Sequence, residues 1–225
     1  FQRCLDRYYD YIEDLENSEF VISMDNDDEK MNTAEAKNYL ASKVNLNSHY
    51  NNNTSKIMAI NADIPTTAWD ILVLISDDMI PEIKGFDQII RSKMKEHYPD
   101  TDGVLWFFDG WREDLNTLCI LGRKYYDRFG YIYHPSYESF WSDAEFTEVG
   151  TNLNKQTYID KVIIRHLHPD IVMADKDTRV KFAEFLPEYA SAGSCGHDQL
   201  WQKNSLEGDP DHKIYLNRKA AGFQI

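Results

Sequence analysis

The sequence predicts an α/β fold with a mostly parallel central sheet flanked by helices. Short and almost continuous apolar runs alternate along the chain with segments of helical periodicity. Continuous apolar runs are typical of strands that are covered on both faces, as in parallel sheets. Acidic residues directly follow two of these runs, and ligands of open α/β sheets bind outside the carboxyl ends of the strands.

Length and charge exclude several classes of protein. The 225 residues suit one domain with an appendage, and 24 basic against 38 acidic residues give a net charge of −14. Such a charge argues against a nucleic-acid partner bound through its phosphates. The longest apolar run, 71–75, is far shorter than the roughly 20 residues of a transmembrane segment. Three widely spaced cysteines indicate a reducing compartment, so we expect a cytoplasmic protein.

The first half of the chain is expected to contain two strands. Leu5, Tyr8, Ile12 and Leu15 recur at helical spacing and predict an amphipathic helix at the start. The segment 45–55 is rich in asparagine and is expected to be a surface loop. The expected helices are 1–16, 33–40, 56–61 and 83–97, and the expected strands are 20–24 and 71–75.

The second half continues the alternation. Gly130 follows a short basic segment in a position typical of a helix end. The tail from Asp175 onward is more polar and mostly helical in pattern. The expected strands are 103–108, 117–121 and 157–165, and the expected helices are 122–129 and 141–154.

Two acidic strand ends are candidate ligand sites. Asp77 and Asp78 repel each other after a buried strand, which favours a bound cation, although a solvated turn explains them equally simply. Hard cations such as Mg²⁺ are held by one or two carboxylates together with substrate phosphates. At the other strand end, Asp25 or Asp27 could accept hydrogen bonds from a base or a ribose.

Two histidines and a helix start extend the candidate site. His166 and His168 stand two residues apart at a strand end and could face the same side, and imidazole suits Mn²⁺ at least as well as Mg²⁺. Asp143 and Glu145 open a helix, where an acid either complements the helix dipole or acts as a general base. The neighbouring Trp141 offers a flat apolar face.

Aromatic and basic side chains complete the set of candidates. Trp111 and Asp109 follow a strand and are expected to be exposed. Cations that could neutralise a diphosphate are Lys56, Arg165, Lys203, Arg218 and Lys219. The sequence contains neither of the two standard glycine-rich phosphate loops. It also has no cysteine spacing typical of a metal site.

Together these stretches resemble a glycosyltransferase of the GT-A type, similar to family 2 enzymes and their bacterial and phage relatives. The resemblance spans about Phe20 to His168, with a weaker match at 196–204. The stretches that carry it are FVISMDNDD (20–28), KIMAINADI (56–64), WDILVLISDDMIP (69–81), LNTLCILGRKYYDRFGYIYHP (115–135), FWSDAEF (140–146) and VIIRHLHP (162–169).

The resemblance implies a fold and an activity. It implies a Rossmann-like nucleotide-sugar-binding and catalytic core at 1–170 and a C-terminal helical extension at 171–225. It also implies transfer of a sugar from a nucleoside-diphosphate donor, expected to be a UDP-sugar, to a hydroxyl of a glycan or another acceptor, with Mn²⁺ or Mg²⁺ as cofactor and inversion at the sugar. The family's first strand has no counterpart before Phe1, so we expect that Phe1 is not the natural start.

The resemblance also implies roles for individual residues. The donor nucleotide is expected at Asp25, Asp27, Lys56, Asn61 and Asp77. The metal is expected at Asp77, Asp78 and His168, with His166 as the alternative histidine. Asp143 matches the catalytic base, but the acid that commonly precedes that base is absent, which leaves Glu145 open. The acceptor is expected at Trp111, Asp109 and Trp141.

Two other functions fit the same residues. A nucleotidyltransferase or phosphohydrolase also uses a metal with carboxylates. A non-catalytic carbohydrate-binding domain would line a groove with Trp106, Trp111 and Trp141 and leave the acids solvated.

Overall fold

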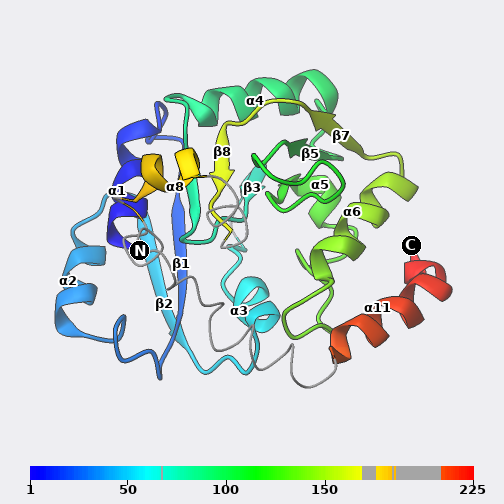
Figure 1. The fold of residues 1–225 in the computed structure, drawn as a ribbon, viewed down its shortest axis with the longest axis horizontal. Coiled ribbons are helices and arrows are strands. Elements are labelled where there is room, and N and C mark those ends of the chain that lie inside the picture. The colour runs from blue at the N-terminus through cyan, green and yellow to red at the C-terminus, as the bar shows by residue number, and fades with distance from the viewer. Residues whose placement is uncertain (67, 169–175, 184, 186–208) are drawn as a thin grey trace.

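The computed structural model describes residues 1–66, 68–168, 176–183, 185 and 209–225, and it confirms the α/β class (Figure 1). Lys203 and the expected match at 196–204 lie outside these residues. Most of the described chain is arranged as strands with helices around them, and the C-terminal helix α11 lies beside α6.

The helices largely follow the expected periodicity. The first helix ends at Tyr11 rather than at residue 16, and Gly85 precedes the fourth helix in a left-handed conformation. The described helices are α1 (Gln2–Tyr11), α2 (Ala34–Ala41), α3 (Lys56–Ala62), α4 (Phe86–His97), α5 (Arg123–Tyr126), α6 (Ser142–Asn152), α8 (Lys176–Phe182), α11 (Pro210–Ala220) and the short 3₁₀ turn η1 (Gly222–Gln224).

The strands form three small sheets rather than the expected mostly parallel central sheet. Within the described residues the sheet orders are β1-β2, β3-β6-β5-β7 and β4-β8, and only the pairs β1–β2 and β5–β7 are parallel. The strands are β1 (Phe20–Asp25), β2 (Leu46–Asn51), β3 (Ile71–Val73), β4 (Met79–Pro81), β5 (Val104–Phe107), β6 (Ile120–Gly122), β7 (Gln156–Ile159) and β8 (Ile164–His166).

The connection between β5 and β6 explains why the largest sheet is mixed. Residues 108–119 contain turns but no helix, so the chain returns antiparallel to β5. A parallel pairing needs a longer crossover, usually through a helix. Gly122 is the last residue of β6, and it lies against the backbone of Thr101 in the segment that precedes β5. A Cβ atom on Gly122 would lie 2.1 Å from the Thr101 carbonyl oxygen.

The expected loop at 45–55 is wrong, because it contains the strand β2. Residues 46–51 pair in parallel with all six residues of β1. The middle of β2 is exposed, and in the described sheet it has a partner on one side only. An edge strand of this kind does not need an apolar pattern, and polar side chains on it discourage aggregation.

The strand expected at 157–165 is divided into β7 and β8, which belong to different sheets. The backbone N–H of Lys161 donates to the carbonyl of Ile159, a turn over only three residues. After this turn, β8 runs antiparallel to β4, a strand that the sequence pattern did not indicate. The turn contains neither glycine nor proline, so no local signal marks the break between the two strands.

Two apolar cores cover the opposite faces of β3. Ile71 and Val73 pack into a core with α1 and α4, whereas Leu72 and Leu74 pack into a second core with α3, α5 and α6. This alternation is what a strand within an α/β layer shows. No helix in the described part of the chain is long and apolar enough to cross a membrane.

Candidate functional site

Three side chains from separate segments form the centre of the candidate site. His166, at the end of β8, places its Nε2 3.3 Å from an Asp78 oxygen and its Nδ1 3.7 Å from an Asp109 oxygen. The antiparallel pairing of β4 with β8 sets Met79 opposite His166 and so brings Asp78 beside the imidazole. Backbone hydrogen bonds from His166 to Asp109 and from Leu167 to Asp78 fix both loops.

The charges of this cluster stabilise one another. Burial alone would lower the pKa of His166, but the two carboxylates outweigh burial and raise the pKa to about 9. Burial would raise the pKa of Asp78, but His166 and the Ser76 hydroxyl hold it well below its usual range. The cluster therefore contains an imidazolium between two carboxylates at neutral pH.

Asp109 is a buried anchor rather than the exposed acceptor contact that we expected. Its side chain is 1% exposed. One carboxylate oxygen accepts from the backbone N–H groups of Trp111 and Arg112, and the other accepts from the Thr117 hydroxyl at 2.6 Å. Asp109 thus shapes the turn after β5 and orients His166.

The pKa of Asp143 is shifted in the opposite direction to the pKa of Asp78. It lies in the first turn of α6, and burial raises the pKa of its carboxyl above the usual range. The positive charges of Lys56 and His166 act on this carboxyl and oppose that rise, so Asp143 belongs to the same electrostatic cluster. Lys56, at the start of α3, also acts on Asp78.

The loop before Asp143 is held by α11. Trp141 adopts a left-handed backbone conformation with φ 63°, which is rare for a bulky residue. Its indole N–H donates to Asp209 at 2.6 Å, and its ring stacks on His212 with centroids 4.2 Å apart. The fully buried Asp211 accepts backbone hydrogen bonds from residues 138–140.

These contacts hold the Trp141 side chain in place. One face of its ring is covered by His212, so it is a fixed part of the loop. Asp209 and Asp211 were missed from the sequence. The only local signal was the Asp-Pro-Asp at a helix start, which predicts a cap and says nothing about contacts with residues about 70 positions away.

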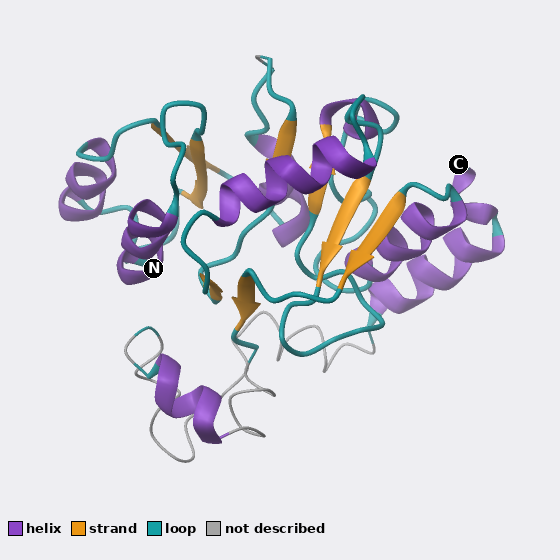
Figure 2. Ribbon diagram, turned by 90° about the horizontal axis from the view of Figure 1, so that it is seen from above, coloured by secondary structure: helices purple, strands orange, loops and turns teal. Residues whose placement is uncertain are grey.

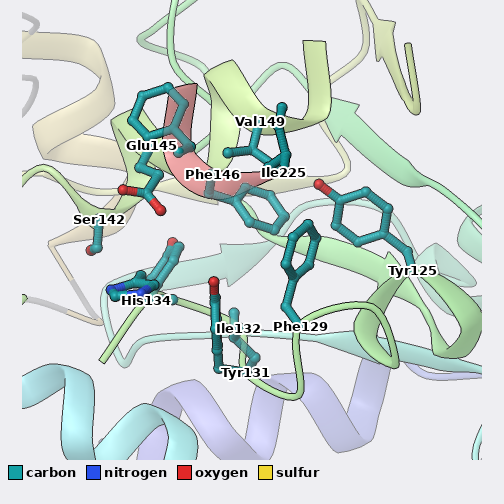
Figure 3. Close-up of a pocket in the computed structure, with 12 residues that line it drawn as sticks. Tyr125, Phe129, Tyr131, Ile132, His134, Ser142, Glu145, Phe146, Val149 and Ile225 are labelled. Carbon is teal, nitrogen blue, oxygen red and sulfur yellow. The ribbon is translucent and has the colours of Figure 1, made fainter. Parts of the chain in front are cut away.

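Glu145 does not share the Asp78–His166 cluster. Its carboxylate binds the Arg218 guanidinium through two hydrogen bonds of 2.7 and 2.8 Å and accepts from the Tyr137 hydroxyl. Figure 3 shows it beside a small cavity among aromatic residues that include His134 and Phe146. With about 20 Å³, this cavity has room for one water molecule and no sugar. Glu145 is therefore a buried acid that is held by Arg218 and Tyr137.

Three of the five expected nucleotide residues, Asp25, Asp27 and Asn61, lie outside the Asp78–His166 cluster, whereas Lys56 acts on it and Asp77 is adjacent to Asp78. Asp25 ends β1 and accepts a hydrogen bond from Asn53, and Asp27 is exposed in the following turn. The Asn61 amide binds the backbone of residues 132 and 133, which makes it a structural residue. Asp63, which the sequence did not single out, is the acid that accepts hydrogen bonds from both β1 and β2.

Three expected residues border the cluster. Asp77 is exposed beside Asp78. The His168 ring lies 5.6 Å from the His166 ring, centroid to centroid, in an edge-on arrangement. Trp111 is 40% exposed, so its ring is accessible on the loop that Asp109 shapes.

The expected basic residues differ in whether carboxylates pair with them. Arg165 pairs with Glu82, and Arg218 and Lys219 also pair with carboxylates, whereas Lys56 is exposed and acts on both Asp78 and Asp143. Within the described residues no three His, Cys, Asp or Glu side chains gather as a complete metal site. Asp78 and His166 supply at most a partial set, and a cation binding both must displace the imidazole proton.

In comparisons with known proteins, no family model, no curated protein and no solved structure matches this chain. The resemblance to GT-A glycosyltransferases therefore depends on the sequence motifs alone.

Proposed function

We propose that the chain is a glycosyltransferase that moves a sugar from a nucleoside-diphosphate donor to an acceptor hydroxyl, with Asp143 as the base. One observation carries the proposal: the His166 imidazole lies 3.3 Å from a carboxylate oxygen of Asp78, and the charge of Lys56 acts on both Asp78 and Asp143, so residues of four distant segments are electrostatically coupled. The proposal includes a GT-A-like sheet, for which the parallel pairs β1–β2 and β5–β7 are partial support.

The two carboxylates of the cluster suit different tasks. A base works best when its pKa is near the working pH, and burial moves the pKa of Asp143 in that direction. Asp78 stays ionised and can hold a cation or a positively charged group. A carboxylate correctly placed as base contributes roughly 10²–10⁴-fold in rate.

The donor diphosphate needs positive charge in a chain of charge −14. Lys56 and protonated His166 supply some of that charge. A bound Mn²⁺ or Mg²⁺ would add Lewis-acid stabilisation of the leaving diphosphate. Asp78 is the residue that would hold it, with the donor phosphates providing further oxygen ligands.

The test combines ligand binding with two isosteric substitutions. We expect a UDP-sugar with Mn²⁺ to raise the thermal unfolding midpoint, and Asp78→Asn to abolish this shift. Asp143→Asn should keep donor binding and lose transfer, measured as nucleoside diphosphate released in the presence of candidate acceptors. Glu29→Gln, at an exposed acid, is the matched control. No shift with any nucleotide sugar, or turnover retained in Asp143→Asn, contradicts the proposal.

A further inference from the structure

The backbone of Trp141 is strained directly before the helix that carries Asp143. Trp141 has φ 63° and ψ −8°, a left-handed conformation, and it is the N-cap residue of α6. A bulky residue keeps such a conformation only where its surroundings enforce it, and strained residues of this kind are concentrated at functional sites. The start of α11 supplies contacts that enforce the conformation here.

One carboxylate joins the start of α11 to the indole. An oxygen of Asp209 accepts from the backbone N–H of His212 at 3.1 Å and so caps α11. The other oxygen accepts from the Trp141 indole N–H at 2.6 Å. The His212 ring lies flat on the indole, with 18° between the ring planes. We call the contacts of Trp141 with Asp209 and His212 the α11 clamp.

The loop before Trp141 is also attached to the helix that carries Lys56. The backbone N–H of Ile57 donates to the carbonyl of Glu138 at 3.3 Å, and the N–H of Glu138 donates to Asp211 in the first turn of α11. The peptide groups of Glu138 therefore connect the start of α3 with the start of α11. A displacement of the start of α11 would reach both Lys56 and Asp143.

Other contacts hold α11 against α6 itself, and Figure 2 shows the two helices side by side near the C-terminus. Arg218 binds Glu145, and the Tyr215 hydroxyl and Lys219 bind Glu148. None of these hydrogen bonds involves the α11 clamp. Substitutions can therefore release the clamp while α11 stays attached to α6.

We propose that Trp141 and Asp209 are positioning residues, and that the α11 clamp holds Asp143 and Lys56 in a fixed relation to each other. The inference rests on the proposed role of Asp143 as the base, and it adds the residues that orient this base. The charged side chains that act most strongly on the Asp143 carboxyl are those of Lys56 and His166, and the clamp contains neither. A change at this carboxyl on loss of the clamp therefore reports its position.

Three variants separate the clamp from the helix cap and from the helix pair. Trp141→Phe keeps an aromatic ring for the stack and removes the indole N–H. Asp209→Ser keeps a preferred N-cap residue but has no second oxygen for the indole. Tyr215→Phe is the matched control, because it removes a hydrogen bond between α11 and α6 outside the clamp and keeps the ring. The pKa of Asp143 is followed by ¹³C NMR of labelled carboxyls, with its resonance assigned by Asp143→Asn, and urea unfolding measures the stability of each variant.

We expect both clamp variants to lower the pKa of Asp143 toward the usual range of an aspartate, because a displaced carboxyl gains water, and the Tyr215→Phe control to leave it unchanged. An unchanged pKa in both clamp variants, or an equal shift in the control, overturns the proposal.

The transfer reaction provides a second readout. In the clamp variants kcat should fall about ten-fold or more while the donor KM stays the same, because the base is displaced and the donor site is not. A raised KM with unchanged kcat contradicts the proposal. The NMR titration needs no substrate, so an unchanged titration refutes the clamp alone, whereas absence of transfer in the unsubstituted chain refutes the proposed function alone.

Discussion

Replacing Asp211 with alanine removes the carboxylate that holds the loop before α6. Asp211 is 2% exposed and accepts backbone N–H hydrogen bonds from Glu138, Ser139 and Phe140 at 3.0, 2.7 and 2.8 Å. Each hydrogen bond to a charged acceptor contributes about 1.5–3 kcal/mol, but the three share one acceptor and do not add. Glu138 is exposed and Phe140 is half-buried, so water can replace the lost acceptor there, and the full penalty falls mainly on the buried N–H of Ser139.

We therefore expect Asp211→Ala to lower the free energy of unfolding by about 3–4 kcal/mol, and Asp211→Asn, which keeps one acceptor oxygen, by roughly half as much. Urea unfolding followed by tryptophan fluorescence measures the loss, and hydrogen exchange should accelerate in 138–142. Asp211 also lies in the first turn of α11, where an acid stabilises the helix dipole. Glu35→Ala, at an exposed first-turn acid of α2, isolates that contribution, which is below about 1 kcal/mol. Equal losses in Asp211→Ala and Glu35→Ala would refute the role of the loop contacts.

Two further predictions concern stability. Asp102 is 4% exposed, and hydrogen bonds from Arg128 and Lys155 outweigh burial and lower the pKa of its carboxyl. The ionised carboxylate therefore stabilises the fold at pH values above 3.8, the pKa in the unfolded chain. This stabilisation is lost as the pH falls through the lower pKa of the folded state. The destabilisation by Asp102→Asn in urea should be constant from about pH 7 to about pH 5 and shrink toward about pH 3, and a pH-independent difference would contradict it. Gly122→Ala should lower the free energy of unfolding by about 3 kcal/mol or more in the same assay, because the added Cβ would overlap the Thr101 carbonyl. Gly130 has a left-handed backbone and open space around it, so Gly130→Ala should lower the free energy of unfolding by only about 1–2 kcal/mol. Equal costs at the two glycines would argue against the overlap.

Patterns among neighbouring residues predicted the strands and helices whose structure follows from their own burial. The apolar run before Asp77 packs against an apolar core on each face, so its continuous pattern indicated a strand with acids at its end. The helix at 86–97 has apolar residues at helical spacing because one side of it packs on the core. Such signals arise from the burial of each element, so they are visible in residues that are close together in the sequence.

Features that depend on a distant partner left no such signal. The strand β2 is polar because it lies at an edge, and its pairing with β1 determines its structure. The contact of His166 with Asp109 depends on how β8 reaches the turn after β5. The buried anchors of the site, Asp109 and Asp211, bind backbone N–H groups, and any acid at a turn has the same local sequence pattern.

The candidate site combines two carboxylates whose surroundings move their pKa values apart. Asp78 lies beside an imidazolium and a hydroxyl donor, which keep it ionised. Burial raises the pKa of Asp143 and outweighs the backbone N–H of Ala144 and the charges of Lys56 and His166, which lower it. Divergent pKa values in neighbouring acids are typical of a division between a group that holds charge and a group that moves a proton. A solvated acidic surface would give both groups the same environment. This difference distinguishes the cluster from a uniformly solvated acidic surface, and it supports the division of roles that we propose.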